Sequence, residues 1–192
     1  RYCDYMAAER VEAGRRNAAD LARLEPRFDP AWADPLYQAS GVPFKAHLMD
    51  AMCEAGLAES IYGARYQELF GKDGPIHNRC RYDSVDQVLT TIQAAGGVAV
   101  LAHPSVYHSM ELAAELAAAG RIDGLEIDHP RNTPEDKAEL RRLAARYDLL
   151  VTGGTDFHGR YAGAPRPMGS CTTPETIIQR IEALARSRKE RK

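Results

Sequence analysis

Three polar residues with metal-binding side chains follow two short apolar runs of the sequence. His103 follows the run 97–101, and Asp156 and His158 follow the run 149–151 and two glycines. Runs of this length and β-branched content are typical of buried strands. Ligands of α/β sheets bind at the carboxyl ends of strands, so we expect these three residues to converge at one rim of a sheet. Imidazole and carboxylate groups suit zinc, manganese or iron.

The spacing within Asp156–His158 indicates how such a site would be built. If the segment continues a strand, its two polar side chains share one face, and Phe157 points the other way, into the packing. Gly153, Gly154 and Gly159 would let the backbone come close to a bound ion or phosphate. The alternative is structural: the aspartate caps a helix and the histidines are hydrogen-bonded within the fold.

A second candidate site lies at the start of a predicted helix, 44–55. Lys45 and His47 stand in its first turn. A helix N-terminus with cations beside it is a natural phosphate site, so we predict that both residues bind substrate. In the alternative, His47 is a partly buried histidine of the capping turn.

Further candidates follow the predicted strand 124–128. His129 and Arg131 come directly after it, and we expect both to hold phosphate at the rim. Glu126 alternates with apolar neighbours, so it faces the other side of the sheet and would point into a barrel. The alternative for Arg131 is a solvated loop arginine. A loop that contains Arg160 and Arg166 could close on substrate.

The elements that must position these residues form two parts. Residues 1–80 are predicted to be a helical domain with helices 2–24, 44–55 and 62–70, and with a proline-broken loop anchored in a small core by Trp32, Leu36 and Tyr37. Residues 81–192 alternate helices and strands, which indicates a mostly parallel sheet. We predict helices 85–95, 109–119, 135–146 and 175–186, strands 98–101, 124–128 and 149–152, and a frayed tail, 187–192.

Composition limits the functional class. The chain has 192 residues, 44% of them hydrophobic, and a net charge of −2. That charge gives no strong field for duplex DNA or an acidic membrane, and no apolar run approaches a membrane span. Four scattered cysteines without a C-x-x-C pair fit a reducing cytoplasm. We expect a cytoplasmic protein that binds a small molecule, while composition leaves the oligomeric state open.

Two motifs carry a family resemblance. Leu101–Pro104 reads Leu-Ala-His-Pro, and Gly154–Gly159 reads Gly-Thr-Asp-Phe-His-Gly. Together they resemble the late motifs of the PHP (polymerase and histidinol phosphatase) phosphoesterases, with most similarity to the nucleoside 3′,5′-bisphosphate phosphatase and RNase AM branch. The similarity is best over 96–104 and 123–159 and extends weakly to the N-terminus.

The resemblance implies a fold, an activity and a set of ligands. The fold would be α/β, the C-terminal part of a distorted seven-stranded (β/α) barrel with a helical insertion that caps the active site. The activity would be metal-dependent hydrolysis of nucleoside 3′,5′-bisphosphates or of short RNA from its 5′ end. Up to three divalent ions (manganese, zinc or iron) would be held, with Asp156, His103 and His158 each matching a ligand of a different ion and serving catalysis.

Several family motifs are absent from the sequence. The family opens with a His-x-His strand and continues with Ser-Asp-Gly, Asp-His-Asp, a Glu and another His, and none of these is found. The chain therefore resembles the later two-thirds of such an enzyme. Because each ion would keep only one protein ligand, we expect this chain alone to be a poor or inactive phosphoesterase.

Three alternatives remain. The chain could be a catalytically incomplete PHP fragment that binds a nucleotide or a partner. It could be another PHP phosphatase, such as a histidinol phosphatase, although the helical insertion argues against this. It could also be a metal-dependent amidohydrolase, because those enzymes likewise place His and Asp at strand ends.

Overall fold

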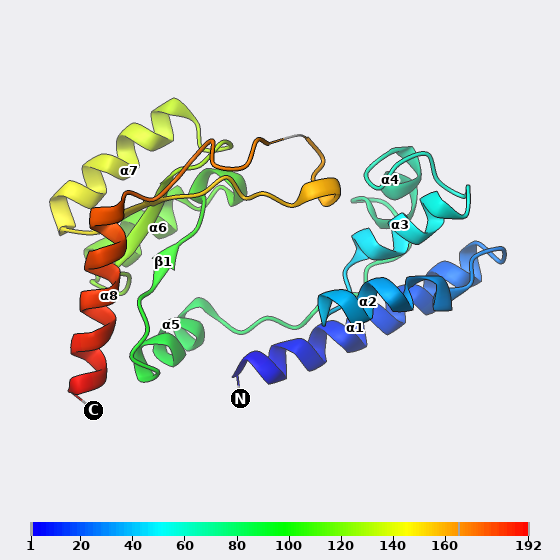
Figure 1. Ribbon diagram of the computed structural model, residues 1–192, viewed down its shortest axis with the longest axis horizontal. Coiled ribbons are helices and arrows are strands. Elements are labelled where there is room, and N and C mark those ends of the chain that lie inside the picture. Colours follow the sequence, from blue (N-terminus) through cyan, green and yellow to red (C-terminus); the bar gives the residue numbers. More distant parts are fainter. Residues whose placement is uncertain (1, 165, 192) are drawn as a thin grey trace. The chain divides into compact units, whose positions relative to one another are not determined.

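The computed structural model describes residues 2–164 and 166–191 (Figure 1). The chain divides into two compact units, Arg1–Tyr82 and Asp83–Lys192. We call them the helical unit and the α/β unit.

The helical unit is built on one long helix, α1, Tyr2–Leu24, with the bounds predicted from its uninterrupted helix-forming composition. It continues through the 3₁₀ turn η1 (Pro30–Ala33) and the helices α2 (Asp34–Ser40), α3 (Lys45–Glu54) and α4 (Ala64–Phe70). Its buried core joins side chains from α1, η1, α3 and α4, among them Leu21, Ala33, Leu48, Met52 and Phe70. Tyr37 of α2 packs against this core, as predicted.

The predicted proline-broken loop was wrong in part. Pro30 and Pro35 each stand in the first turn of a short helix, where a missing N–H is harmless and a fixed φ favours the turn. The prediction that Trp32 anchors the core was also wrong, because the residue is 44% exposed. Phe28 packs edge-on against its ring and takes the buried position instead.

The α/β unit opens with α5, Val85–Ala94, whose first turn is capped by Ser84 and Gln87 in a capping box. Strands β1 (Val100–Leu101), β2 (Gly124–Asp128) and β3 (Leu150–Gly153) follow as a parallel sheet in the order β1-β2-β3. The connections are η2 (Pro104–Tyr107) with α6 (Met110–Ala118) and then α7 (Pro134–Tyr147). After β3 come η3 (Gly159–Tyr161) and α8 (Glu175–Glu190).

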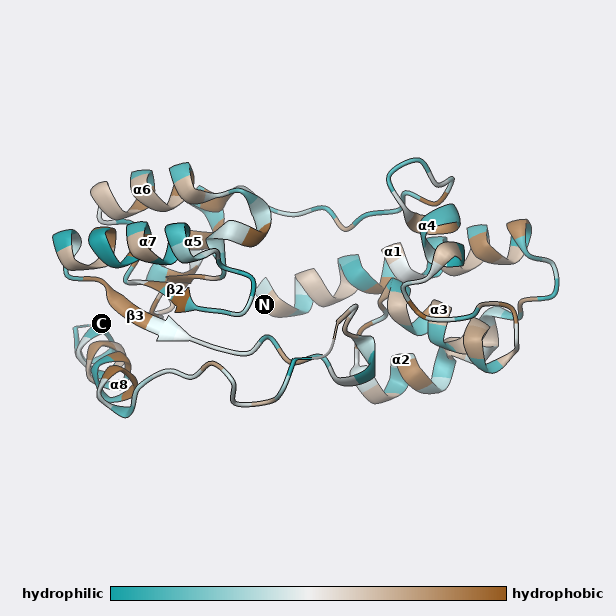
Figure 2. Ribbon diagram, turned by 90° about the horizontal axis from the view of Figure 1, so that it is seen from above, coloured by the Kyte–Doolittle hydropathy of each residue, from teal (hydrophilic) through white to brown (hydrophobic). Residues whose placement is uncertain are grey.

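The core of this unit lies between the sheet and two of its helices. Apolar residues of β2 meet α6 and α7, with Leu125, Ile127 and Leu140 fully buried. Figure 2 shows α6 and α7 on one side of the strands and α8 on the other. α8 contacts β3, yet none of its described residues is buried, so that side of the sheet is thinly covered.

Two details differ from the sequence prediction. β1 holds only two residues where four were predicted, since Val98 and Ala99 precede the regular ladder. The tail from Ser187 was predicted to fray, but α8 continues to Glu190 because Arg188 is fixed by Asp123 and by the carbonyl of Gly97. The described sheet has three parallel strands. It fits a mixed helix and sheet fold, and the barrel stays a prediction.

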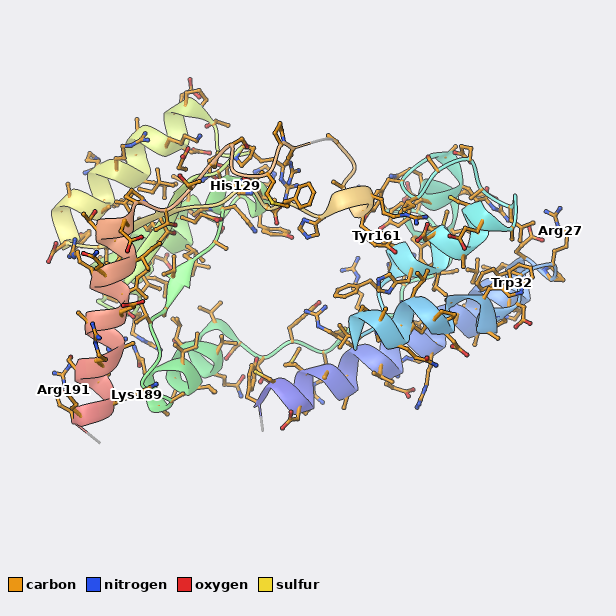
Figure 3. The ribbon with its side chains drawn as sticks, viewed as in Figure 1. Arg27, Trp32, His129, Tyr161, Lys189 and Arg191 are labelled. Carbon is orange, nitrogen blue, oxygen red and sulfur yellow. The ribbon has the colours of Figure 1, made fainter. Side chains whose placement is uncertain are left out.

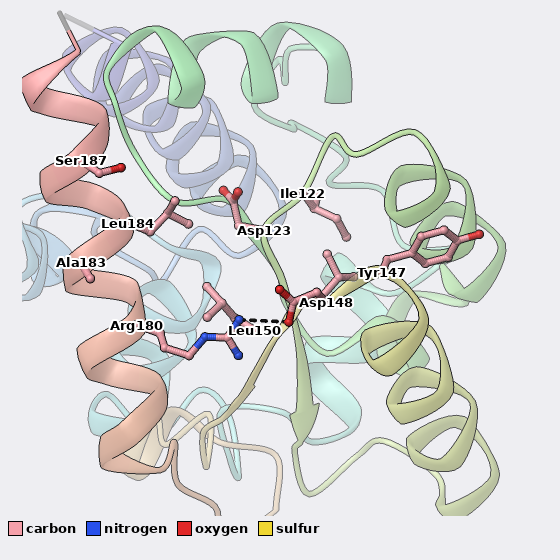
Figure 4. Close-up of a pocket in the computed structure, with 10 residues that line it drawn as sticks. Ile122, Asp123, Tyr147, Asp148, Leu150, Arg180, Ala183, Leu184 and Ser187 are labelled. Carbon is pink, nitrogen blue, oxygen red and sulfur yellow. Dashed lines mark hydrogen bonds and ion pairs between the residues drawn. The ribbon is translucent and has the colours of Figure 1, made fainter.

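A cavity of about 560 Å³ lies under α8 at the amino ends of β2 and β3. It is lined by Leu150 and Leu184, among others, and the ion pair between Arg180 and Asp148 lies in its wall (Figure 4). Its lining residues include none of those predicted to bind metal or substrate.

Among the described residues, no helix combines the length and the apolar character that crossing a membrane requires. The four cysteines, all of them described, form no disulfide bond.

Candidate functional site

The three parallel strands bring three loops to one edge of the sheet. His103 follows β1, His129 follows β2, and Asp156 follows β3 after a short turn. The rings of His103 and His129 lie 5.0 Å apart between centroids, and Nε2 of His129 is 3.6 Å from Oδ2 of Asp156. The structure therefore places His103, Asp156 and His158 in one cluster, with His129 between the first two.

His103 is held in an unusual backbone conformation. Its φ is 29° and its ψ 63°, outside the regions that L-residues prefer. Its N–H donates to Oε2 of Glu126 at 2.9 Å, which fixes the turn into η2. Nδ1 of the ring is buried, and no described residue gives it a hydrogen bond. A strained residue with an unpaired buried nitrogen is typical of a functional position.

His129, labelled in Figure 3, is fully buried at the end of β2. Its Nδ1 accepts a hydrogen bond from the N–H of Arg131 at 3.1 Å. A ring nitrogen that accepts carries no proton, so the neutral ring must carry its proton on Nε2. Burial lowers the pKa of His129 and favours this neutral form. Nε2 has no hydrogen-bond partner among the described atoms, so His129 offers an N–H donor to the cluster.

The carboxylate of Asp156 is surrounded by basic side chains of this unit. Its Oδ2 lies 3.0 Å from NH1 of Arg166 and 3.6 Å from NH2 of Arg131, and its Oδ1 lies 3.5 Å from Nδ1 of His158. Burial works to raise the pKa of Asp156, but the charges of His158, His129, His103 and Arg166 outweigh it and hold that pKa below its ordinary value. Asp156 also has a φ of 54°, a second strained residue of the cluster.

The predicted strand geometry of Asp156–His158 was wrong. β3 ends at Gly153, and the left-handed conformation of Asp156 breaks the alternation of side chains. Phe157 does not point into the packing, since it is 51% exposed. The side chains of Asp156 and His158 nevertheless meet, because Nδ1 of His158 turns back to the carbonyl of Asp156 at 2.8 Å.

The glycines after β3 do allow a close approach. A Cβ on Gly153 would lie 2.7 Å from the carbonyl of Thr172 and 2.8 Å from Cβ of Asp128. A Cβ on Gly154 would lie 3.1 Å from Oε1 of Glu126. These contacts bring the chain after β3 against β2, and the close neighbours are protein atoms.

Three residues of the cluster were missed or underrated by sequence reasoning. Glu126 was predicted only to face away from its apolar neighbours, and it holds the N–H of His103. Arg166 was noted only as part of a loop, and it makes the shortest ion pair to Asp156. Asn132 had no signal: its amide donates to the carbonyls of Glu126 and Ile127, and it accepts from the N–H of Ser105.

Lys45 and His47 lie in the helical unit. His47 is buried, and its Nδ1 accepts from the N–H of Phe44, which is the capping-turn geometry of the alternative reading. Burial lowers the pKa of His47 and favours its neutral form. Lys45 lies with Nζ 5.1 Å from the ring centre of Phe70. Their part in substrate binding stays a prediction.

The known proteins to which this chain is similar in sequence are named as enzymes that act on phosphate esters. The chain is 32% identical to a phosphoribosyl 1,2-cyclic phosphate 1,2-diphosphodiesterase of Eggerthella lenta, over 79% of this chain and 60% of the relative. It is 27% identical to the 5′-3′ exoribonuclease Rnm of Escherichia coli, over 81% of this chain and 55% of that protein. It is 29% identical to a 3′,5′-nucleoside bisphosphate phosphatase of Chromobacterium violaceum, over 78% of this chain and 53% of the phosphatase. No family model matches the chain.

A solved structure agrees with these sequences. A Bifidobacterium adolescentis protein assigned as a metal-dependent phosphoesterase superposes with a TM-score of 0.78 at 27% identity, over 94% of this chain and 64% of that one. These relatives agree with the resemblance to PHP phosphoesterases. It spans between about half and two-thirds of the length of these relatives. An amidohydrolase structure from Chromobacterium violaceum, with a TM-score of 0.68 at 21% identity, shares the fold.

The metal sites implied by the PHP resemblance can be tested against the cluster. In the part of the chain that the structure describes, no three or more His, Cys, Asp or Glu side chains are placed to hold a metal ion. His103 and Asp156 have the right chemistry, but Asp156 is paired with arginine and His129 is fixed as an N–H donor. The described residues therefore do not form a metal centre by themselves, and His103, Asp156 and His158 stay predicted as ligands.

The arrangement is suited to an anionic oxygen. Arg166, Arg131 and His129 all lie near one oxygen, Oδ2 of Asp156, at 3.0, 3.6 and 3.6 Å. Guanidinium groups and a neutral imidazole N–H are donors that phosphate binds well.

Proposed function

We propose that the protein to which this chain belongs is a phosphoesterase that removes phosphate from nucleoside 3′,5′-bisphosphates or trims the 5′ ends of short RNA. The convergence of Arg166, Arg131 and His129 on one carboxylate oxygen carries this proposal. The same donors would hold a non-bridging phosphate oxygen. The homologues that act on phosphate esters support it.

Within this proposal the two arginines, His129 and Glu126 have defined parts. The two arginines neutralise charge on the phosphate, and Nε2 of His129 donates to one of its oxygens. Glu126 positions His103 by holding its N–H. A divalent ion (manganese, zinc or iron) would need ligands beyond the described residues, because these residues alone offer no group of three.

The test is phosphate release by the protein from its complete coding sequence, with manganese present. We expect release from 3′-phosphoadenosine 5′-phosphate, and its loss in Asp156→Asn, which removes a charged group with little change of shape. Arg142→Gln is the control, because that arginine lies on the surface of α7, where it pairs with Glu139. Equal turnover in Asp156→Asn at equal metal content would refute the assignment, and turnover of amides alone would favour the amidohydrolase.

The part of His129 has its own test. His129→Gln keeps an N–H₂ donor near the position of Nε2, whereas His129→Leu removes it. We expect the glutamine variant to retain much of the activity and the leucine variant to raise KM for the phosphate ester at unchanged metal content. Loss of bound metal in both variants would show that His129 is a ligand and not a donor.

The described chain alone is better suited to a second function, the binding of a phosphorylated ligand without hydrolysis. The absence of a three-ligand group among the described residues favours this reading. The 192-residue chain should bind 3′-phosphoadenosine 5′-phosphate, retain little metal by elemental analysis, and release little phosphate. Tight stoichiometric metal with robust turnover would contradict it.

A further inference from the structure

A second pocket lies entirely within the helical unit, between α1 and the start of α3. Its volume is about 230 Å³, so a ligand the size of a nucleoside monophosphate would fill it and extend to its open side. Gly14 forms part of its wall, since a Cβ there would lie 2.4 Å from Cγ of Pro43. α1 can therefore lie directly against the segment that leads into α3.

The floor of this pocket contains an unpaired acceptor. Asn17 is 5% exposed, and its Nδ2 donates to the carbonyl of Asn78 at 3.3 Å. Because a carbonyl can only accept, this bond fixes the orientation of the amide. Oδ1 is left buried without a partner among the described atoms. A buried acceptor of this kind needs an N–H or O–H donor from a ligand or a water.

Three cations surround the same pocket. Arg10, Lys45 and Arg79 line it, and within the described chain none of the three makes an ion pair with a carboxylate. The guanidinium of Arg10 lies 5.3 Å from the ring centre of Phe44. Burial, together with the charge of Arg79, lowers the pKa of Lys45, so the two cations are close enough to repel each other. An anion between them would relieve that repulsion.

Exposed aromatic rings complete the lining. Phe44 is 45% exposed and Tyr82 is 64% exposed, and both border the pocket. Exposed rings beside cations are the usual platform for a nucleobase, which stacks while its phosphate is neutralised.

We propose that this pocket of the helical unit binds a nucleoside monophosphate, with the phosphate at Lys45, Arg79 and Arg10 and an N–H of the base at Oδ1 of Asn17. The binding is independent of the phosphoesterase proposal, because every residue involved lies in the helical unit. The pocket includes Lys45, which the sequence marked as substrate-binding, and adds Arg10, Asn17 and Arg79.

The test is titration of the 192-residue chain with AMP, adenosine, ribose 5-phosphate and inorganic phosphate, with chelator present. Amide NMR shifts locate the binding. We expect AMP to bind about tenfold or more tightly than ribose 5-phosphate, which lacks the base contact, and than adenosine, which lacks the phosphate contact. A tenfold difference corresponds to roughly 1.4 kcal/mol for each contact. The shifts should appear at Gly14, Asn17 and Phe44.

Variants separate the two contacts. Arg79→Gln should weaken the affinity for AMP about tenfold. Lys72 is exposed and lies outside the pocket, so Lys72→Gln should leave that affinity unchanged. Asn17→Ala should remove the preference for AMP over ribose 5-phosphate, with the fold checked by circular dichroism. Equal binding of AMP and ribose 5-phosphate to the unmodified chain would reduce the pocket to an anion site and overturn the proposal. Shifts confined to residues 129–131 would overturn it as well.

Discussion

Replacement of Arg188 by methionine tests what holds α8 to the sheet. The guanidinium of Arg188 donates to both carboxylate oxygens of Asp123 and to the carbonyl of Gly97, which precedes β1. The Asp123 side chain is 16% exposed and also accepts from the N–H of Ala99 at 2.8 Å. The substitution therefore leaves a mostly buried carboxylate with one remaining donor.

The expected cost follows from these contacts. Removing one partner of a buried ion pair typically costs roughly 3–5 kcal/mol, and hydrogen bonds to charged groups are each worth about 1.5–3 kcal/mol. Arg188 is 25% exposed and Asp123 keeps its bond to Ala99, which reduces the loss. We expect Arg188→Met to destabilise the α/β unit by about 2–3 kcal/mol.

Two measurements test this: the free energy of unfolding in urea, and the rate of amide hydrogen exchange at Ala99, whose N–H donates to Asp123. Arg180→Met on the same helix is the matched control. Arg180 makes one hydrogen bond to Asp148, whose side chain is 92% exposed. Arg180→Met should therefore lower the free energy of unfolding by no more than about 0.5 kcal/mol. Equal stability losses in the two variants would refute the reasoning that burial of Asp123 makes the Arg188 contact strong.

Two further predictions concern backbone space and pH. Gly153→Ala should lower the free energy of unfolding in urea by about 1–3 kcal/mol, because the new Cβ meets the backbone carbonyl of Thr172. Gly154→Ala should lower it by less, because its Cβ meets only a side chain. A larger loss of stability in Gly154→Ala would contradict this. The Arg27 guanidinium lowers the pKa of Glu25 to about 2, below its ordinary value, so the stabilisation is present above about pH 4.5 and is lost as the pH falls toward 2. Glu25→Gln should therefore lower stability at pH 7 and match the parent chain near pH 2, and a difference that persists there would exclude this ion pair as the cause.

Local signals in the sequence determined most of the elements. The bounds of α1 and β2 agree with the prediction, and α5 and α7 begin within one residue of the predicted positions, behind the caps of Ser84 and Thr133. These features depend on neighbouring residues, through helix propensity, capping and turn geometry, so a single sequence contains them. The grouping of His103, Asp156 and His158 was also predictable, because parallel strands carry their following residues to one edge.

The tertiary structure decided the rest. The proton position of His129 depends on the N–H of Arg131 in a tight turn, and the place of Arg166 depends on a loop that returns to Asp156. α8 keeps its last turns because Asp123, 65 residues earlier, is buried beside Arg188. Such contacts join segments far apart in the chain. Their strength depends on how deeply the partners are buried, and the residue types in the sequence do not determine that burial.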